Sequence, residues 1–194
     1  MDTALLLHGR GGNSDENWFP WLQKELNKRF LDIYTPNLPN TNNPILEEQI
    51  DYINVYASDF KDGGYIIAHS LGCQLTMKFI EENNIKNSII IFVAPSYPGL
   101  AKKLGKKILG NNYEILDKYF DIEIDFKKIN TLNNKYYIFL SDNDPFINME
   151  NAKLYYKKLN NVEFKEFKNK GHFNQGAGIL ELKEIMELIN INIH

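Results

Sequence analysis

The amino-acid sequence predicts an α/β protein, with a mostly parallel sheet that carries helices on both faces. Short runs of wholly apolar or β-branched residues recur along the chain, amphipathic segments separate them, and no repeat or linker-like segment divides the 194 residues. Strands buried on both faces are typical of parallel sheets, and intervening helices provide the crossovers that parallel pairing needs. We therefore expect one domain spanning residues 1–194.

The expected elements alternate between strand and helix along the chain. Apolar, β-rich runs predict strands at 4–8, 32–36, 64–70, 88–95, 136–142 and 162–167. Amphipathic patterns predict helices in the segment that follows Ser14 (NWFPWLQKELNKRF) and at 44–60, 71–84, 148–159 and 179–189. Pro44 suits a first helical turn, and Asn148 is a suitable N-cap for the helix that follows it.

The segment 96–135 is too long for a simple connection between the strands at 88–95 and 136–142. We expect it to form a small lid inserted over one edge of the sheet. Its lysines, Lys102, Lys103, Lys106 and Lys107, are most simply a solvated helix face, and attraction of an acidic substrate or a membrane surface is a weaker alternative.

Composition excludes several classes of protein. The net charge of −3 gives no basis for nucleic-acid binding, and no apolar run approaches the length that crosses a bilayer. The single cysteine, Cys73, excludes an intrachain disulfide and is expected to be a buried, inert thiol. With no basic leader at the N-terminus, a cytoplasmic location is expected.

Four polar residues, His8, Ser70, Asp144 and His172, lie at or just past the ends of predicted strands. Because the carboxyl ends of parallel strands share one edge of a sheet, where ligands bind in this class, we expect all four residues there.

Ser70 stands in the segment AHSLG, between a predicted strand and a predicted helix. This context fits a nucleophile elbow, G-x-S-x-G, in which small residues on either side relieve the crowding of a tight turn. Ala68 replaces the first glycine of that motif. A serine that only caps the following helix fits the local sequence nearly as well.

The order of the remaining candidates favours catalysis. SDNDPFI supplies Asp142 and Asp144 after one strand, and GHF supplies His172 after the next. Serine, then aspartate, then histidine is the order used by α/β-hydrolases. We choose Asp144 as the acid, because it stands three residues before the branched residue Ile147, and expect Asp142 to shape the turn.

The loop HGRGGN follows the first strand, as a loop of an oxyanion hole would. We assign the oxyanion donors to the backbone amides of Arg10 and Leu71. Trp18 and Phe19 are candidates to border an acyl pocket, although such residues more often belong to a core. His8 can stiffen the loop by hydrogen bonding, and His69 is expected to be structural.

Taken together, HGRGG with NWFPWL, AHSLG, SDNDPFI and GHF resemble the small serine hydrolases typified by the YdeN protein and retinoblastoma-binding protein 9. The resemblance runs from Leu7 to roughly the last helix. It implies a compact α/β-hydrolase fold, with Ser70, Asp144 and His172 at the triad positions.

The function expected is that of a serine hydrolase, carboxylesterase-like, which cleaves small ester, thioester or amide substrates through an acyl-enzyme on Ser70. No cofactor is expected. No metal site is expected either, because the histidines at 8, 69, 172 and 194 lack the spacing of a ligand set. A protein partner is not indicated. The alternative is a protein-interaction module that keeps the fold with little or no turnover.

Overall fold

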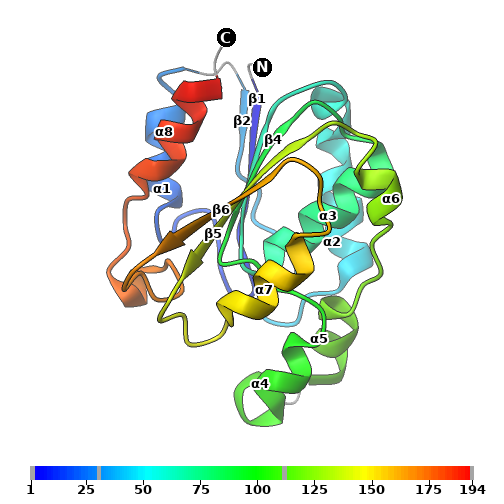
Figure 1. The fold of residues 1–194 in the computed structure, drawn as a ribbon, viewed down its shortest axis with the longest axis vertical. Helices are drawn as coiled ribbons and strands as arrows, with labels where there is room; N and C mark the ends of the chain where they lie inside the picture. The colour runs from blue at the N-terminus through cyan, green and yellow to red at the C-terminus, as the bar shows by residue number, and fades with distance from the viewer. Residues whose placement is uncertain (1–2, 30–31, 111–112, 193–194) are drawn as a thin grey trace.

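The computed structural model describes residues 3–29, 32–110 and 113–192. Its centre is a six-stranded sheet in the order β2-β1-β3-β4-β5-β6, in which every neighbouring pair is parallel (Figure 1). The strands are β1 (Thr3–Leu7), β2 (Asp32–Tyr34), β3 (Tyr65–His69), β4 (Ile89–Val93), β5 (Lys135–Ser141) and β6 (Val162–Phe167). The predicted α/β class is confirmed.

Helices cover both faces of this sheet (Figure 1). One face carries α1 (Phe19–Leu26) and α8 (Lys183–Asn192), and the other carries α2 (Leu46–Ile53), α3 (Leu71–Asn83) and α7 (Met149–Tyr156). A 3-10 helix, η1 (Asn54–Phe60), continues from α2, and a second, η3 (Gln175–Ala177), follows β6.

The predicted helices differ from the structure in their bounds, three of them by four residues or more at one end. The segment 44–60 becomes 3-10 after Ile53, where Asn54, Val55 and Ser58 lower the helix propensity. The last helix begins at Lys183 rather than at 179, because the amide of Ile179 bonds to the carbonyl of Asn174 within a loop. The first helix ends at Leu26, and Phe30 of its predicted span lies outside the described residues.

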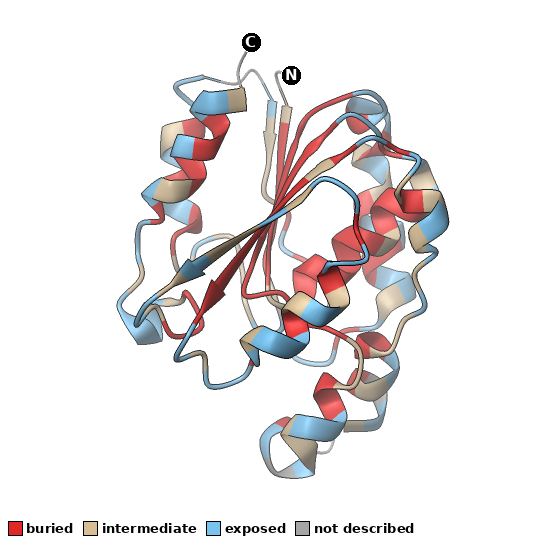
Figure 2. Ribbon diagram, viewed as in Figure 1, coloured by how far each residue is buried: buried red, intermediate tan, exposed pale blue. Residues whose placement is uncertain are grey.

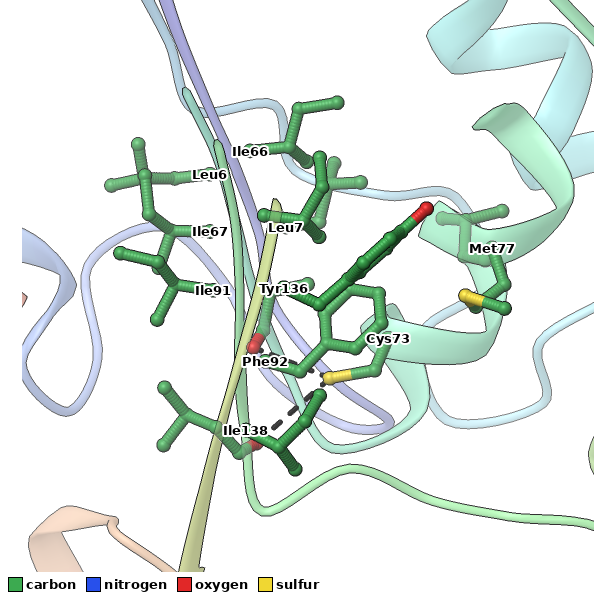
Figure 3. Close-up of a cluster of buried hydrophobic side chains, with 14 of the residues drawn as sticks. Leu6, Leu7, Ile66, Ile67, Cys73, Met77, Ile91, Phe92, Tyr136 and Ile138 are labelled. Carbon is green, nitrogen blue, oxygen red and sulfur yellow. Dashed lines mark hydrogen bonds between the residues drawn. The ribbon is translucent and has the colours of Figure 1, made fainter. Parts of the chain in front are cut away.

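The core is built from alternate residues of the central strands (Figure 3). Leu6, Ile67 and Ile91 occupy one row across β1, β3 and β4, and their side chains lie on the side of the sheet opposite to α3. On the α3 side, Phe92 packs near Cys73, which is buried and donates its Sγ–H to the carbonyl of Ala68 at 3.3 Å. Ala68 itself is fully buried in the strand, where a small side chain suffices.

Residues between β4 and β5 form α4 (Leu100–Leu109), α5 (Tyr113–Phe120) and α6 (Phe126–Ile129). In Figure 1 α4 and α5 project beyond the carboxyl edge of the sheet, and Figure 2 shows α4 largely exposed on its outer side. Lys102 and Lys106 lie there, as a solvated face predicts; the side chain of Lys107 lies outside the described set. Across the described segments, none of the helices combines the length and the apolar character needed to span a membrane.

Candidate active site

Ser70 lies at a sharp turn between β3 and α3. Its backbone has φ 54° and ψ −119°, a conformation that residues other than glycine rarely adopt. No hydrogen bond from its side chain caps α3, so the structure does not favour the capping alternative for this serine. A strained turn of this kind is the geometry expected of a nucleophile elbow.

Two glycines allow the chain to pack tightly around this turn. A Cβ on Gly72 would lie 2.6 Å from the carbonyl oxygen of His8, and a Cβ on Gly9 would lie 2.8 Å from the Cβ of Ser70. Real side chains do not approach so closely, so α3 can begin against the end of β1 only with glycine at these positions.

Ser96, just after β4, fixes the backbone of the elbow. Its amide and its hydroxyl both donate to the carbonyl oxygen of Ser70, each at 3.2 Å. The hydroxyl of Tyr156 in turn donates to the carbonyl of Ser96 at 2.7 Å. The strained residue is therefore held from the neighbouring strand and from α7.

Ser70, His172 and Asp144 are joined in one chain of hydrogen bonds. His172 Nε2 lies 3.0 Å from Ser70 Oγ, and His172 Nδ1 lies 2.8 Å from Asp144 Oδ2. Since the carboxylate can only accept when ionised, Nδ1 carries the proton and Nε2 is free to accept from the serine hydroxyl. Such an arrangement can remove a proton from Ser70 as its oxygen attacks.

The two candidate aspartates have different surroundings. Asp144 is nearly inaccessible, and its Oδ1 accepts the amides of Phe146 and Ile147 at 2.8 and 3.0 Å. Asp142 instead accepts the amide of Asn169 at 2.9 Å and closes the turn after β5. Of these two aspartates, Asp144 is the one that bonds to His172.

Three consecutive residues at the end of β5 hold the loop that carries His172. Besides the bond of Asp142 to Asn169, the hydroxyl of Ser141 accepts the amide of Lys170 at 3.0 Å. Asn143 Oδ1 accepts the amide of Gly171 at 2.8 Å. The acid and the histidine therefore sit on two loops that are bonded residue by residue.

The loop after β1 is also pinned. The amide of Gly11 donates to Thr41 at 2.7 Å, the amide of Gly12 donates to Gly9 at 3.2 Å, and Arg10 Nε donates to the carbonyl of Asn42 at 3.2 Å. Among the described residues, the amides of Arg10 and Leu71 donate to no other protein group. Both remain available to a bound ligand.

A hollow of about 350 Å³ opens over Ser70 and His172. One part of its lining is apolar and comes from α4 and the acid loop: Leu100, Leu104, Ile108, Leu109, Phe146 and Ile147. Another part is polar and comes from the loops after β1 and β6: Arg10, Glu16, Asn17, Asn174 and Gln175.

Trp18 and Phe19 are absent from this lining, contrary to the expectation that they border an acyl pocket. Both are buried and stack on one another, with ring centroids 4.4 Å apart. Trp18 Nε1 donates to the carbonyl of Phe173 at 3.0 Å, which ties α1 to the loop of His172. The indole faces inward because its N–H finds that carbonyl, a long-range partner that local sequence cannot show.

Comparison with known proteins decides the family. Residues 4–190 match the family model described as serine hydrolase. The chain belongs to this serine hydrolase family.

The chain is also similar to a curated relative in sequence and to solved structures in fold. The chain is 26% identical to the hydrolase YdeN of Bacillus subtilis over 188 residues, which cover 96% of this chain and 93% of YdeN. The crystal structure of the B. subtilis ydeN gene product superposes with a TM-score of 0.77 at 24% identity, covering 98% of both chains. Est1E of Butyrivibrio proteoclasticus, with ferulic acid bound, has a TM-score of 0.69 at 16% identity, over 98% and 90% of the chains.

Two further titratable side chains near Ser70, those of His8 and Cys73, are buried. His8 Nε2 accepts the amide of Leu38 at 3.0 Å, so its Nδ1–H faces the carbonyl of Gly9 at 2.9 Å, and burial lowers the pKa of His8. Burial raises the pKa of the Cys73 thiol well above its usual value.

Within the described parts of the chain, no group of three or more His, Cys, Asp or Glu side chains is placed to hold a metal ion.

Sequence reasoning missed the polar residues that support the hydrogen-bonded chain. Ser96 and Asn143 are short polar side chains that directly follow predicted strands, at the same sheet edge as Ser70. That position was the available signal. Their hydrogen bonds join segments far apart in the chain, and spacing alone does not reveal such partners.

Proposed function

We propose that this serine hydrolase is a carboxylesterase in which Ser70 is the nucleophile, His172 the general base and acid, and Asp144 the residue that orients the histidine. The observation that carries the proposal is the 3.0 Å contact between Ser70 Oγ and His172 Nε2 at a strained strand-to-helix turn. Esters are the first substrate class, and the same chemistry extends to thioesters and amides.

The proposed reaction has two halves. In the first, Ser70 Oγ bonds to the substrate carbonyl carbon while its proton passes to His172 Nε2. The tetrahedral intermediate then collapses, and His172 returns that proton to the leaving alcohol. In the second half, water attacks the acyl carbon and gives one proton to His172. The bond between Ser70 Oγ and the acyl carbon then breaks, and His172 returns that proton to Ser70 Oγ as the carboxylic acid leaves.

The oxyanion of each tetrahedral intermediate is assigned to the amides of Arg10 and Leu71. Both amides lack another acceptor among the described residues, and both belong to segments that pack against the elbow. A donor of this kind contributes about 3–4 kcal/mol to stabilising the transition state. The steps use only side chains, backbone amides and water, so the proposed mechanism requires no cofactor.

The lining of the hollow supports a small-molecule acyl substrate. A volume of about 350 Å³ is at the small end for ligand sites, so we propose short or medium acyl groups. We place the acyl chain against Leu104 and Ile108 of α4. In this proposal residues 1–194 form one domain, and residues 96–135 form its lid. A cytoplasmic location is part of the proposal, in keeping with the single buried thiol of Cys73.

The test is hydrolysis of p-nitrophenyl acetate and butyrate by wild type, Ser70→Ala and Ser58→Ala, all checked for folding by circular dichroism. Ser58 is an exposed serine on η1 and serves as the matched control. We expect wild type and Ser58→Ala to turn over both esters, and Ser70→Ala to be inactive. Folded wild type without turnover would favour the protein-interaction alternative.

A further inference from the structure

His69 directly precedes the nucleophile, and its side chain reaches the backbone of His172. His69 Nε2 lies 2.8 Å from the carbonyl oxygen of His172, and the two imidazole centroids are 4.9 Å apart. Because a carbonyl only accepts, Nε2 of His69 must carry the proton. His172 is therefore bonded by two consecutive residues: Ser70 bonds to its imidazole, and His69 bonds to its backbone carbonyl.

The backbone around His172 needs such support. Gly171 has φ 52° and Phe173 has φ 49°, so residues on both sides of the histidine lie in the left-handed region. For a bulky residue such as Phe173 this conformation is costly and persists only when its surroundings hold it. Asn143 holds the amide of Gly171, and Trp18 holds the carbonyl of Phe173. His69 holds the carbonyl between them.

We propose that His69 is a positioning residue, which fixes the backbone of His172 so that its imidazole faces Ser70 and Asp144 at once. This inference rests on the proposed function, because it assigns a role in the same proton transfer. It explains why a polar side chain stands at a buried position of β3, next to an apolar run.

The electrostatic environment suits this role. Burial, together with the neighbouring His172, lowers the pKa of His69 to about 3, so the ring stays neutral at neutral and mildly acidic pH. The titratable groups that face it are His172 on the loop after β6 and His8 at the end of β1, while Asp144 faces only His172. A neutral donor anchors His172 without adding a second cation beside the imidazolium that forms during catalysis.

The test compares His69→Phe with His69→Gln. Phenylalanine fills the ring's volume without a donor, whereas the glutamine Nε2 can replace the N–H. For His69→Phe we expect kcat to fall roughly 10- to 100-fold with little change in KM, because a small misplacement of a catalytic group costs about this much. His69→Gln is expected to keep kcat within about threefold of wild type.

Two further measurements separate positioning from packing. In His69→Phe the acidic limb of the profile of kcat/KM against pH should move to lower pH, because a weakened contact with Asp144 stabilises the imidazolium less. The downfield proton resonance of His172 Nδ1–H should shift in the same variant, and both signals should stay at their wild-type positions in His69→Gln.

The inference is overturned if folded His69→Phe keeps the wild-type kcat, pH profile and proton resonance. It is also overturned if both variants lose activity and thermal stability to the same extent, since the ring volume would then matter and not the N–H. Wild type without turnover would refute the proposed function instead, and the proton resonance would still report whether His69 holds His172.

Discussion

The elbow and α4 both line the hollow over Ser70, yet they differ in how deeply their residues are buried. Around Ser70, β3 is wholly buried and most of α3 is buried, as the red ribbon in Figure 2 shows. By contrast, Ile108 of α4, which also lines the hollow, is 52% exposed. The proposed nucleophile thus lies between buried elements, β3 and α3. Ile108, which is proposed to contact the acyl chain, lies on a more exposed helix.

Glycines make the same distinction. Gly9 and Gly72 are required near the elbow because a side chain would collide with neighbouring backbone or with Ser70. Gly99, Gly105 and Gly110 of the α4 region have positive φ, and open space surrounds the position of an added Cβ. The first group of glycines serves close packing, and the second serves backbone conformation, including the break within α4 at Gly105. This contrast leads us to expect large effects from changes near the elbow and small ones from changes on α4.

The largest effect short of removing the nucleophile is expected at the acid. Asp144→Asn should lower kcat/KM by about 10⁴-fold, because the amide favours the wrong histidine tautomer. Asp142→Asn is the matched control, and we expect it to cost less than roughly tenfold, since the carboxylate of Asp142 accepts the amide of Asn169 and does not bond to His172. Steady-state ester hydrolysis measures both, and equal losses would contradict the assignment of the acid.

Packing at the elbow is tested next. Gly72→Ala should lower the free energy of unfolding by about 1–3 kcal/mol, because the new methyl group meets the backbone oxygens of Leu7 and His8. Gly176→Ala is the control, since its methyl group would meet the side chain of Asn174, no closer than 3.3 Å, and no backbone atom. Urea denaturation measures both changes. If Gly72→Ala left the free energy of unfolding unchanged, the backbone around Gly72 would have to shift more easily than the structure indicates.

The buried His69 predicts how stability changes with pH. Its pKa is about 3 in the folded protein against 6.5 for an ordinary histidine, so the unfolded chain binds the extra proton between these values. Its contribution to stability is therefore complete above about pH 6.5 and is lost as pH falls towards 3, at up to about 1.4 kcal/mol per pH unit. Urea titrations should give His69→Gln a shallower decline than wild type over this range, and parallel curves would refute a neutral His69.

The smallest effect is expected on α4. Ile108→Ala should lower kcat/KM for a hexanoate ester by roughly 3- to 10-fold, through lost apolar contact, and leave the acetate ester unchanged. Because Ile108 is half exposed, its loss should change stability by no more than about 0.5 kcal/mol. Lys106→Ala, on the outer face, is the control and should change neither rate. An equal loss of kcat/KM for the acetate and hexanoate esters would show that the acyl chain does not contact Ile108.

Much of this architecture was predictable because its signals are local. Apolar runs, together with the alternating segment 162–167, located all six strands, and the parallel sheet follows from their alternation with helices. Given that sheet, polar residues at strand ends had to share one edge. The structure duly brings Ser70, Asp144 and His172 into hydrogen-bond contact.

The unpredicted features depend on contacts between distant segments. The indole of Trp18 could have lined a pocket or entered the core, and the carbonyl of Phe173, 155 residues away, is the partner that holds it in the core. The bond from His69 to His172 spans 103 residues, and the bond from Asn143 to Gly171 spans 28. The predicted start of the last helix at 179 was wrong for a related reason, because the bond from Ile179 to Asn174 keeps this segment in a loop and α8 begins at Lys183.

The nucleophile is tested most directly by finding which residue reacts with an active-site serine probe. Wild type is treated with a fluorophosphonate, digested, and the adduct is located by mass spectrometry. We expect a single adduct on Ser70, none in Ser70→Ala, and normal labelling of Ser58→Ala. An adduct on another serine, or none on folded wild type, would contradict the proposed site.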